Sequence, residues 1–161
     1  EKKRKIKFDA VVMVQGDEPM VKSEMITESL EPIIRDKEID VTNLLGKISS
    51  EAEFYDTNCI KVVHTLDQKA LYFSRQPIPT RSIIENAAIG KQVAIISFRR
   101  NFLIEYIGLA PTPLELAESV DMMRILEHGF NIYMVPTSHE SFAVDTEEDL
   151  EKVKRYFKEN L

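Results

Sequence analysis

Two aspartates that lie far apart in the sequence each follow a run of apolar residues. Asp17 lies in Val-Gln-Gly-Asp-Glu-Pro at 14–19, directly after the apolar run 8–14. Asp145 lies in Val-Asp-Thr-Glu-Glu-Asp-Leu at 144–150, where another apolar run ends. In open α/β sheets, ligands bind outside the carboxyl ends of the strands. Because Mg²⁺ usually takes one or two carboxylates together with substrate phosphates, the pair predicts a magnesium site that carries phosphates.

Each aspartate also allows a structural interpretation. Asp17 could cap the segment that follows it, although Gly16 beside it would let the backbone approach a ligand closely. Asp145 could open an acidic helix N-terminus, since carboxylates there interact favourably with the helix dipole. Considered together, the two aspartates favour a metal-binding site over two separate structural roles. We therefore predict that Asp17 and Asp145 are catalytic residues and ligands of Mg²⁺.

Four further charged residues are candidates for contact with a substrate. Arg75 ends an apolar run before the Pro-rich turn 76–79, where its guanidinium could hold a carboxylate or phosphate with two hydrogen bonds. Lys61 interrupts an apolar strand, so it either contacts a ligand or lies at a sheet edge. Glu115 and Glu118 are three residues apart and share one face of a helix. The structural alternative for Arg75 and for both glutamates is a position on the solvated surface.

The elements that must hold these residues alternate between strand and helix patterns. Continuous apolar runs predict strands, and apolar residues at helical spacing predict helices. The expected strands are 8–14, 41–48, 59–64, 70–74, 93–98 and 131–135. Four helices are expected: one that starts at Ser23, one over 101–106, one from Pro113 to Gly129, and one that starts near Asp145 or Thr146. The pattern predicts an α/β fold over a single domain, 1–161, with a mostly parallel sheet and a β-rich excursion in the middle.

Composition limits the remaining possibilities. The chain has 161 residues, of which 43% are hydrophobic, and this suffices for one domain with a buried core. A net charge of -6 argues against nucleic acid as a partner. The single cysteine, Cys59, excludes a disulfide framework and a thiolate metal cluster. No apolar run approaches the roughly 18 residues of a membrane span, and no signal peptide is visible. We expect no membrane partner and a cytoplasmic location.

Six motifs occur in a fixed order along nearly the whole chain. They are Val-Gln-Gly-Asp-Glu-Pro at 14–19, Asn-Cys-Ile-Lys-Val-Val at 58–63, Ala-Leu-Tyr-Phe-Ser-Arg-Gln-Pro-Ile-Pro at 70–79, Pro-Thr-Pro-Leu-Glu at 111–115, Leu-Glu-His-Gly at 126–129 and Val-Asp-Thr-Glu-Glu-Asp-Leu at 144–150. In this order the set resembles the 3-deoxy-manno-octulosonate (Kdo) cytidylyltransferases, also called CMP-Kdo synthetases. The ordered set is highly specific for the wider family of CMP-sugar synthetases.

The resemblance implies a nucleotide-diphospho-sugar transferase fold, which is Rossmann-like, and a Mg²⁺-dependent reaction. The anomeric hydroxyl of a 2-keto sugar acid would attack the α-phosphate of CTP, and pyrophosphate would leave. Asp17 and Asp145 would then hold the magnesium ion. Gln15 and Arg75 would contact the sugar acid. This agrees with the interpretation drawn from the residues alone, because catalysis of this kind needs positioning and charge neutralisation rather than covalent chemistry.

The same resemblance assigns roles to the middle of the chain. Glu115 and Glu118 would bind sugar hydroxyls. From its place in an apolar strand, we also expect Lys61 to contact the substrate. The hairpin at 59–74, the Pro-rich turn and the 113–128 helix would form a sugar lid and the surface of a homodimer. Sugar-side positions depart from the family, since Thr80 stands where many members carry Trp and Met122 stands where they carry Gln.

One family feature has no counterpart in the sequence. The family begins with a strand and a Gly-rich basic loop that holds the CTP triphosphate, and no segment of this chain matches it. We therefore expect the N-terminal third of the domain to lie before Glu1, and we expect these 161 residues alone not to turn over CTP. Two alternatives remain: a nucleotidyltransferase of the same fold for another sugar or nucleotide, and a non-catalytic binding module.

Overall fold

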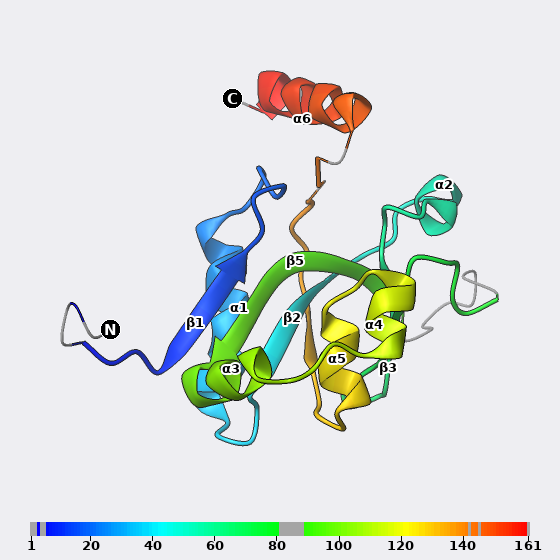
Figure 1. The fold of residues 1–161 in the computed structure, drawn as a ribbon. Helices are drawn as coiled ribbons and strands as arrows, with labels where there is room; N and C mark the ends of the chain where they lie inside the picture. Colours follow the sequence, from blue (N-terminus) through cyan, green and yellow to red (C-terminus); the bar gives the residue numbers. More distant parts are fainter. Residues whose placement is uncertain (1–2, 4–5, 81–88, 142, 145, 161) are drawn as a thin grey trace.

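The computed structural model describes residues 3, 6–80, 89–141, 143–144 and 146–160. A six-stranded sheet lies at its centre (Figure 1), with the order β4-β3-β5-β2-β6 and with β1 paired to β5. The strands are β1 (Ala10–Val14), β2 (Val41–Gly46), β3 (Lys61–His64), β4 (Ala70–Ser74), β5 (Ile89–Arg99) and β6 (Tyr133–Pro136). Each strand overlaps a run predicted to be a strand, although β5 extends beyond the predicted run 93–98 at both ends, and the β3–β4 hairpin is confirmed.

The direction of the strands differs from the prediction of a mostly parallel sheet. Among the described pairings only β2–β6 is parallel, and β5 runs antiparallel to β1, β2 and β3. The reason is that β5 is inserted between β1 and β2, which themselves run in the same direction. An apolar run predicts burial on both faces but carries no information on strand direction.

The shared direction of β1, β2 and β6 determines where a site can form. Their carboxyl ends lie at one edge of the sheet, which is the upper edge in Figure 1. The turn that holds Asp17 follows β1 at this edge. The chain after β6 also rises along this side toward α6 (Glu147–Asn160).

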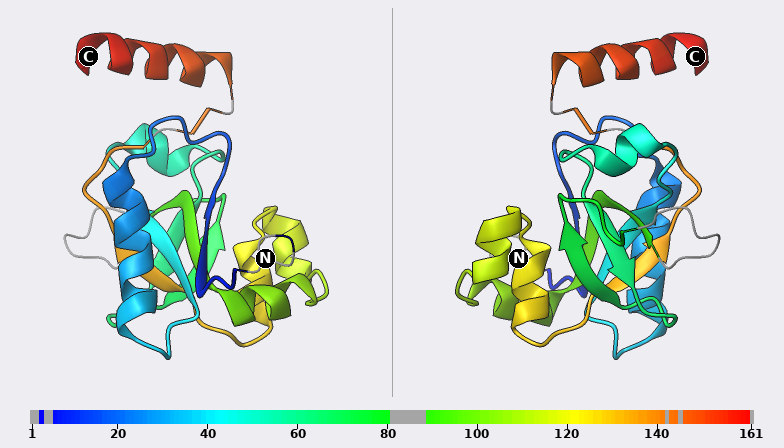
Figure 2. Two further views of the ribbon diagram at one scale, coloured as in Figure 1. Left: turned by 90° about the vertical axis from the view of Figure 1, so that its left-hand side faces the viewer. Right: turned by 90° about the vertical axis from the view of Figure 1, so that its right-hand side faces the viewer.

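Helices cover both faces of the sheet (Figure 2). On one face, α1 (Ser23–Arg35) places Met25 in a buried cluster with Leu44, Val93 and Ile95. On the other face lie α3 (Arg100–Ile107), α4 (Pro113–Glu118) and α5 (Met122–Glu127). The larger core cluster lies beneath these helices, so both faces of the sheet are packed against helices.

The helix predicted from Pro113 to Gly129 is two helices. The chain leaves α4 at Ser119, whose φ of 53° lies in the left-handed region, and α5 begins at Met122. This break turns Met122 inward, where it is 0% exposed, so the expected sugar-facing position of Met122 is wrong. Helical periodicity continued across residues 119–121 because apolar spacing alone does not reveal a single residue with positive φ.

The short helix α2 (Glu51–Tyr55) was absent from the sequence prediction. Ser50 caps it, since its side chain accepts a hydrogen bond from the Glu53 N–H at 3.1 Å. Glu53 in turn accepts from the Ser49 N–H at 2.6 Å. A serine followed three residues later by glutamate is the signature of a helix start, so the sequence did hold the signal for this helix.

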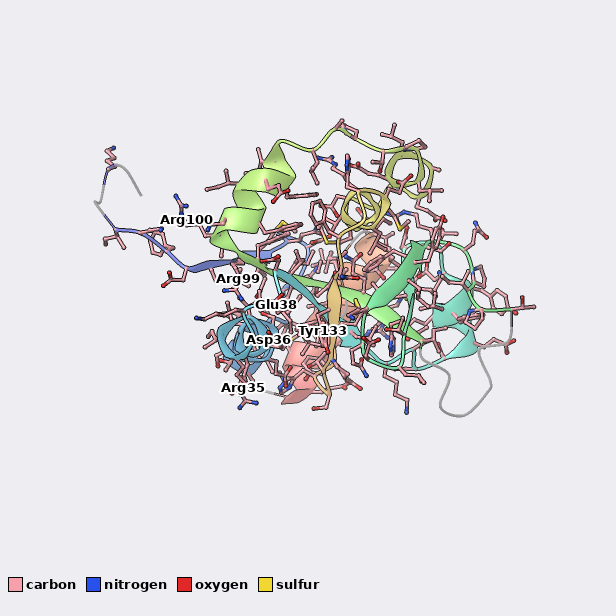
Figure 3. The ribbon with its side chains drawn as sticks, turned by 90° about the horizontal axis from the view of Figure 1, so that it is seen from below. Arg35, Asp36, Glu38, Arg99, Arg100 and Tyr133 are labelled. Atoms are coloured by element: carbon pink, nitrogen blue, oxygen red, sulfur yellow. The ribbon has the colours of Figure 1, made fainter. Side chains whose placement is uncertain are left out.

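The opposite edge of the sheet is fixed by Arg99 (Figure 3). Its guanidinium donates to the carbonyls of Ile33, Asp36 and Ile39 at 2.8, 2.9 and 3.0 Å. Because the last carbonyls of a helix have no partner within the helix, these hydrogen bonds fix the end of α1 against β5. Among the helices of the described residues, none has the length and apolar character required to cross a bilayer.

Candidate active site

A pocket of about 460 Å³ opens at the carboxyl end of β1. Its wall includes the turn after β1, α2, the segment before β3, the middle of β5 and the first turns of α6. Three of the predicted site residues line it, namely Gln15, Asp17 and Arg75. A second pocket, of about 330 Å³, lies at the opposite edge of the sheet and is lined by no predicted site residue.

Asp17 offers a carboxylate oxygen to this pocket. Its Oδ1 atom is buried and receives no hydrogen bond from the described residues. The backbone carbonyl of Asp17 accepts from the Val144 N–H at 2.9 Å, which brings the segment before α6 against the turn. Asp145, the next residue, lies outside the described residues. A buried carboxylate oxygen without a donor fits a cation, because such an oxygen is costly to bury unless something compensates its charge.

The turn around Asp17 is held in place by backbone groups of β5. The Gln15 N–H donates to the Ala94 carbonyl at 3.2 Å, so Gln15 continues the β1–β5 pairing. Gln15 is exposed and its side chain lies at the pocket wall. Gly16 has open space where a Cβ atom would lie, so no described neighbour requires glycine at this position.

Glu18 is a second acid in this turn, and the sequence analysis did not single it out. It is 6% exposed, and its Oε1 accepts from the Ala94 N–H at 2.9 Å. Its Oε2 accepts from the hydroxyl of Ser141, which is also buried. Glu18 thereby joins the turn after β1 to β5 and to the segment before α6. Its position beside Asp17 was visible in the sequence, but its burial was not, because turn residues follow no periodic pattern.

Arg75 lies at the pocket wall and also holds the surrounding backbone. Its Nε donates to the Glu118 carbonyl at 2.9 Å, and its Nη1 donates to the Thr57 carbonyl at 3.0 Å. Its Nη2 donates to the Ser119 carbonyl at 3.3 Å. These acceptors are neutral, so the guanidinium charge of Arg75 is not neutralised by them. A positive charge held at a fixed place in the wall suits an anionic substrate group.

Lys61 lies behind the pocket wall rather than in it. The residue is 0% exposed, and its Nζ donates to the carbonyls of Asp56, Cys59 and Arg75, each at 2.6 Å. Burial lowers the pKa of the Lys61 ammonium. Because three acceptors use its three donors, the expected contact of Lys61 with a substrate is not supported by this geometry, and the residue holds the 56–59 segment instead.

Glu118 also lies away from the pocket and connects α4 to β4. Its Oε1 accepts from the hydroxyls of Tyr72 and Ser74 at 3.1 and 3.0 Å. Its Oε2 accepts from the Arg75 N–H at 2.9 Å. Glu118 therefore positions Arg75, and the structure does not bring it to the pocket as a ligand for sugar hydroxyls.

Glu115 has a structural role at the start of α4. It completes a capping box with Thr112, whose N–H donates to Glu115 Oε2 at 3.1 Å. The same carboxylate pairs with Arg124 of α5, whose Nε donates at 2.7 Å. This hydrogen-bonded pair lowers the pKa of Glu115 and raises that of Arg124. Glu115 thus links α4 to α5 and is absent from the pocket lining.

Further charged groups line the pocket that the sequence analysis did not propose. Lys91 of β5 forms an ion pair with Glu53 of α2. In the first turns of α6, Lys152 forms an ion pair with Asp149 at 3.3 Å. Charges of both signs around a space of this size suit a ligand that carries phosphates together with a cation. Cys59 also lines the pocket, and burial raises the pKa of its thiol to about 11.

The sequence and the fold were compared with known proteins. A family model described as cytidylyltransferase matches residues 2–155 of the chain. The chain belongs to the cytidylyltransferase family. Among its relatives, the 3-deoxy-manno-octulosonate cytidylyltransferase of Geobacter metallireducens is 41% identical over 92% of this chain and 63% of that protein. The enzyme of the same name from Fusobacterium nucleatum is 37% identical over 95% of this chain and 62% of that protein.

A solved structure of a related enzyme has the same fold as this cytidylyltransferase. CMP:2-keto-3-deoxy-manno-octonic acid synthetase complexed with CTP superimposes with a TM-score of 0.86 and 34% identity. The match covers 98% of this chain and 65% of that chain. The predicted nucleotide-diphospho-sugar transferase fold is therefore confirmed. The chain spans slightly less than two-thirds of the length of the relatives it matches.

Proposed function

We propose that the protein transfers CMP from CTP to the anomeric hydroxyl of a 2-keto sugar acid, with Kdo as the first candidate. The observation that carries this proposal is the buried, unpartnered Oδ1 of Asp17 in the wall of a large charged pocket. Membership of the cytidylyltransferase family supports CTP as the nucleotide. The relatives named as Kdo cytidylyltransferases support Kdo as the acceptor.

The reaction forms one bond and breaks another at the same phosphorus atom. The anomeric oxygen bonds to the α-phosphorus of CTP and loses its proton. The bond from that phosphorus to the oxygen bridging to the β-phosphate breaks, and pyrophosphate leaves. Mg²⁺, when bound, would neutralise phosphate charge and help to orient the reacting groups. The protein contributes by positioning and by electrostatic stabilisation, because no residue needs to form a covalent intermediate.

In this reaction, separate residues of the chain would bind the metal ion and the sugar acid. Asp17 would hold the magnesium ion, with Asp145 as the second predicted ligand. Arg75 would bind the carboxylate of the sugar acid, because its charge is fixed in the pocket wall by three neutral carbonyls. Gln15, exposed at the same wall, would orient the sugar. Glu118 would act through Arg75 rather than on the substrate.

We further propose that the protein acts as a homodimer in the cytoplasm. Three leucines near the β3–β4 hairpin and α4 support a dimer surface there, since Leu71, Leu114 and Leu116 are 59%, 38% and 72% exposed. We also propose that these 161 residues alone do not release pyrophosphate from CTP. The absence of a Gly-rich basic loop from the sequence supports this, and CMP-sugar formation by the 161-residue chain would overturn it.

The proposal is tested by measuring pyrophosphate release from CTP by the full-length protein, with Mg²⁺ and a panel of 2-keto sugar acids. Release with one sugar acid, lost in Asp17→Ala, would establish the reaction and name the acceptor. Asp9→Ala is the matched control, because Asp9 is exposed just before the start of β1, the strand that Asp17 follows. Absence of release with every sugar acid, in a folded protein, would reject the proposed reaction.

A further inference from the structure

We propose that Glu18 is a positioning residue that fixes the Asp17 turn between β5 and the segment before α6. The expected effect of Glu18 on the use of Mg²⁺ rests on the proposed function. The anchoring of the Asp17 turn by Glu18 does not depend on that function. Glu18 is buried at 6% exposure, and both of its carboxylate oxygens accept hydrogen bonds from groups outside the turn.

The first contact of Glu18 completes a strand pairing that the chain itself leaves unfinished. β1 ends at Val14, opposite Ile95, and the Gln15 N–H still reaches the Ala94 carbonyl at 3.2 Å. The next N–H of β5 on this edge belongs to Ala94, and it donates to Glu18 Oε1 at 2.9 Å. In a continued pairing this N–H would donate to the Gln15 carbonyl, which here accepts from the Glu18 N–H at 3.2 Å, so the side chain of Glu18 takes the place of that carbonyl. This anchors the turn to the sheet at a point three residues from Gln15.

The second contact of Glu18 attaches a segment that is distant in sequence. Glu18 Oε2 accepts from the hydroxyl of Ser141, which is 5% exposed. Three residues later, the Val144 N–H donates to the Asp17 carbonyl at 2.9 Å. Two neighbouring contacts therefore hold the segment before α6 on the turn, one through Glu18 and one through the backbone of Asp17. Both contacts flank Asp17, whose Oδ1 receives no hydrogen bond from the described residues.

The arrangement explains why a carboxylate is buried so close to Asp17. A buried carboxylate is tolerated only where its oxygens are satisfied, and here one oxygen binds a backbone N–H and the other binds a hydroxyl. Removing Glu18 would leave the Ala94 N–H and the Ser141 hydroxyl without this partner. The Asp17 turn would then sample more positions, and a cation held by Asp17 would be bound less tightly.

The test compares Glu18→Ala, Glu18→Gln and Ser141→Ala with the unmodified full-length protein. Glu31→Ala is the control, because Glu31 is an exposed acid on α1 that pairs only with Arg35 among the ion pairs of the described residues. Two quantities are measured: the Mg²⁺ concentration that gives half-maximal pyrophosphate release, and the rate of amide hydrogen exchange at Val144. The exchange measurement requires neither metal nor turnover.

For Glu18→Ala we expect both quantities to rise at least about tenfold, because the variant loses two hydrogen bonds to a charged group and the loss of one alone accounts for about tenfold. Ser141→Ala should change both in the same direction by less. Glu18→Gln should leave the Mg²⁺ requirement and the exchange rate at Val144 close to those of the unmodified protein, because its amide offers an acceptor to the Ala94 N–H and a donor to the Ser141 oxygen. The Glu31→Ala control should change neither.

Three results would overturn the inference. The first is unchanged exchange at Val144 in Glu18→Ala and Ser141→Ala. The second is a lower melting temperature with an unchanged Mg²⁺ requirement, which would reduce Glu18 to a purely structural role. The third is a Glu18→Gln variant as impaired as Glu18→Ala, which would assign the effect to charge rather than position. If the unmodified protein releases no pyrophosphate, the proposed function fails, and the exchange rates alone decide on Glu18.

Discussion

Lys61 is buried, and within the described part of the chain its ammonium pairs with carbonyl groups and with no carboxylate. Three backbone carbonyls accept from its ammonium, from Asp56 and Cys59 on one side and from Arg75 on the other. Neutral acceptors compensate desolvation only in part, which agrees with the lowered pKa of Lys61. At the scale of the single residue, the sequence indicated an unusual lysine in an apolar strand, but it could not distinguish a ligand contact from an internal one.

We predict that Lys61→Met lowers the free energy of unfolding by about 2–4 kcal/mol, because three carbonyls lose a charged donor. The measurement is urea denaturation followed by circular dichroism. Lys69→Met is the control, since Lys69 pairs with Asp67 near the hairpin tip and its side chain is 42% exposed. An exposed pair of this kind contributes little to stability, because solvent screens it. Equal losses of unfolding free energy in Lys61→Met and Lys69→Met would contradict the view that Lys61 holds the 56–59 segment in place.

The elements themselves were largely predictable because burial leaves a clear mark in the sequence. The hairpin β3–β4 and the long strand β5 lie where apolar runs indicated, since each strand is packed into the core. The break between α4 and α5 was not predictable from apolar spacing, because it depends on the left-handed backbone of Ser119. The roles of Glu115 and Glu118 as ligands for sugar hydroxyls stay predictions, and in this structure both side chains bind neighbouring elements.

Ser119 provides a direct test of this break. Its φ of 53° is unfavourable for a residue with a Cβ atom, so Ser119→Gly should raise the free energy of unfolding by about 0.5–1 kcal/mol. Gly129 has a φ of 83°, so Gly129→Ala should lower it by about 1 kcal/mol for the same reason. Both predictions are checked by comparing the denaturation midpoints of Ser119→Gly and Gly129→Ala with that of the unmodified protein. A loss of stability in Ser119→Gly would mean that its side chain outweighs the backbone strain.

The link between α4 and α5 should depend on pH in a defined direction. The hydrogen bond from Arg124 lowers the pKa of Glu115 in the folded state below its ordinary value of 4.5. A depressed pKa stabilises the fold above the ordinary value, and this contribution is lost as pH falls through the folded pKa. We predict that Glu115→Gln costs about 1–2 kcal/mol at pH 7 and that the difference shrinks toward pH 3. A cost independent of pH would show that the charge of Glu115 contributes nothing.

At the scale of the whole molecule, the sequence predicted the fold class better than the sheet topology. Apolar runs indicate which segments are buried, and the ordered motifs indicated the family, but neither gives the direction of β5. The same limit applies to the pocket, since Glu53 and Lys91 meet only when α2 packs beside β5. Residues that come together through tertiary packing leave no spacing signal, whereas Asp17 could be proposed from the sequence because it lies in the turn that follows a strand.

The proposed dimer is also a property of the whole molecule, and it yields the last prediction. Leu116 is 72% exposed on α4, near the hairpin surface that we assign to the dimer. An aspartate introduced there would have to be desolvated in the interface, so Leu116→Asp should weaken the dimer at least about tenfold. Ile34→Asp is the control, because Ile34 is 74% exposed on α1, on the other face of the sheet. Sedimentation velocity over a range of concentrations gives the dissociation constant. A Leu116→Asp protein that dimerises as tightly as the Ile34→Asp control would place the interface elsewhere, and a monomeric unmodified protein would reject the dimer altogether.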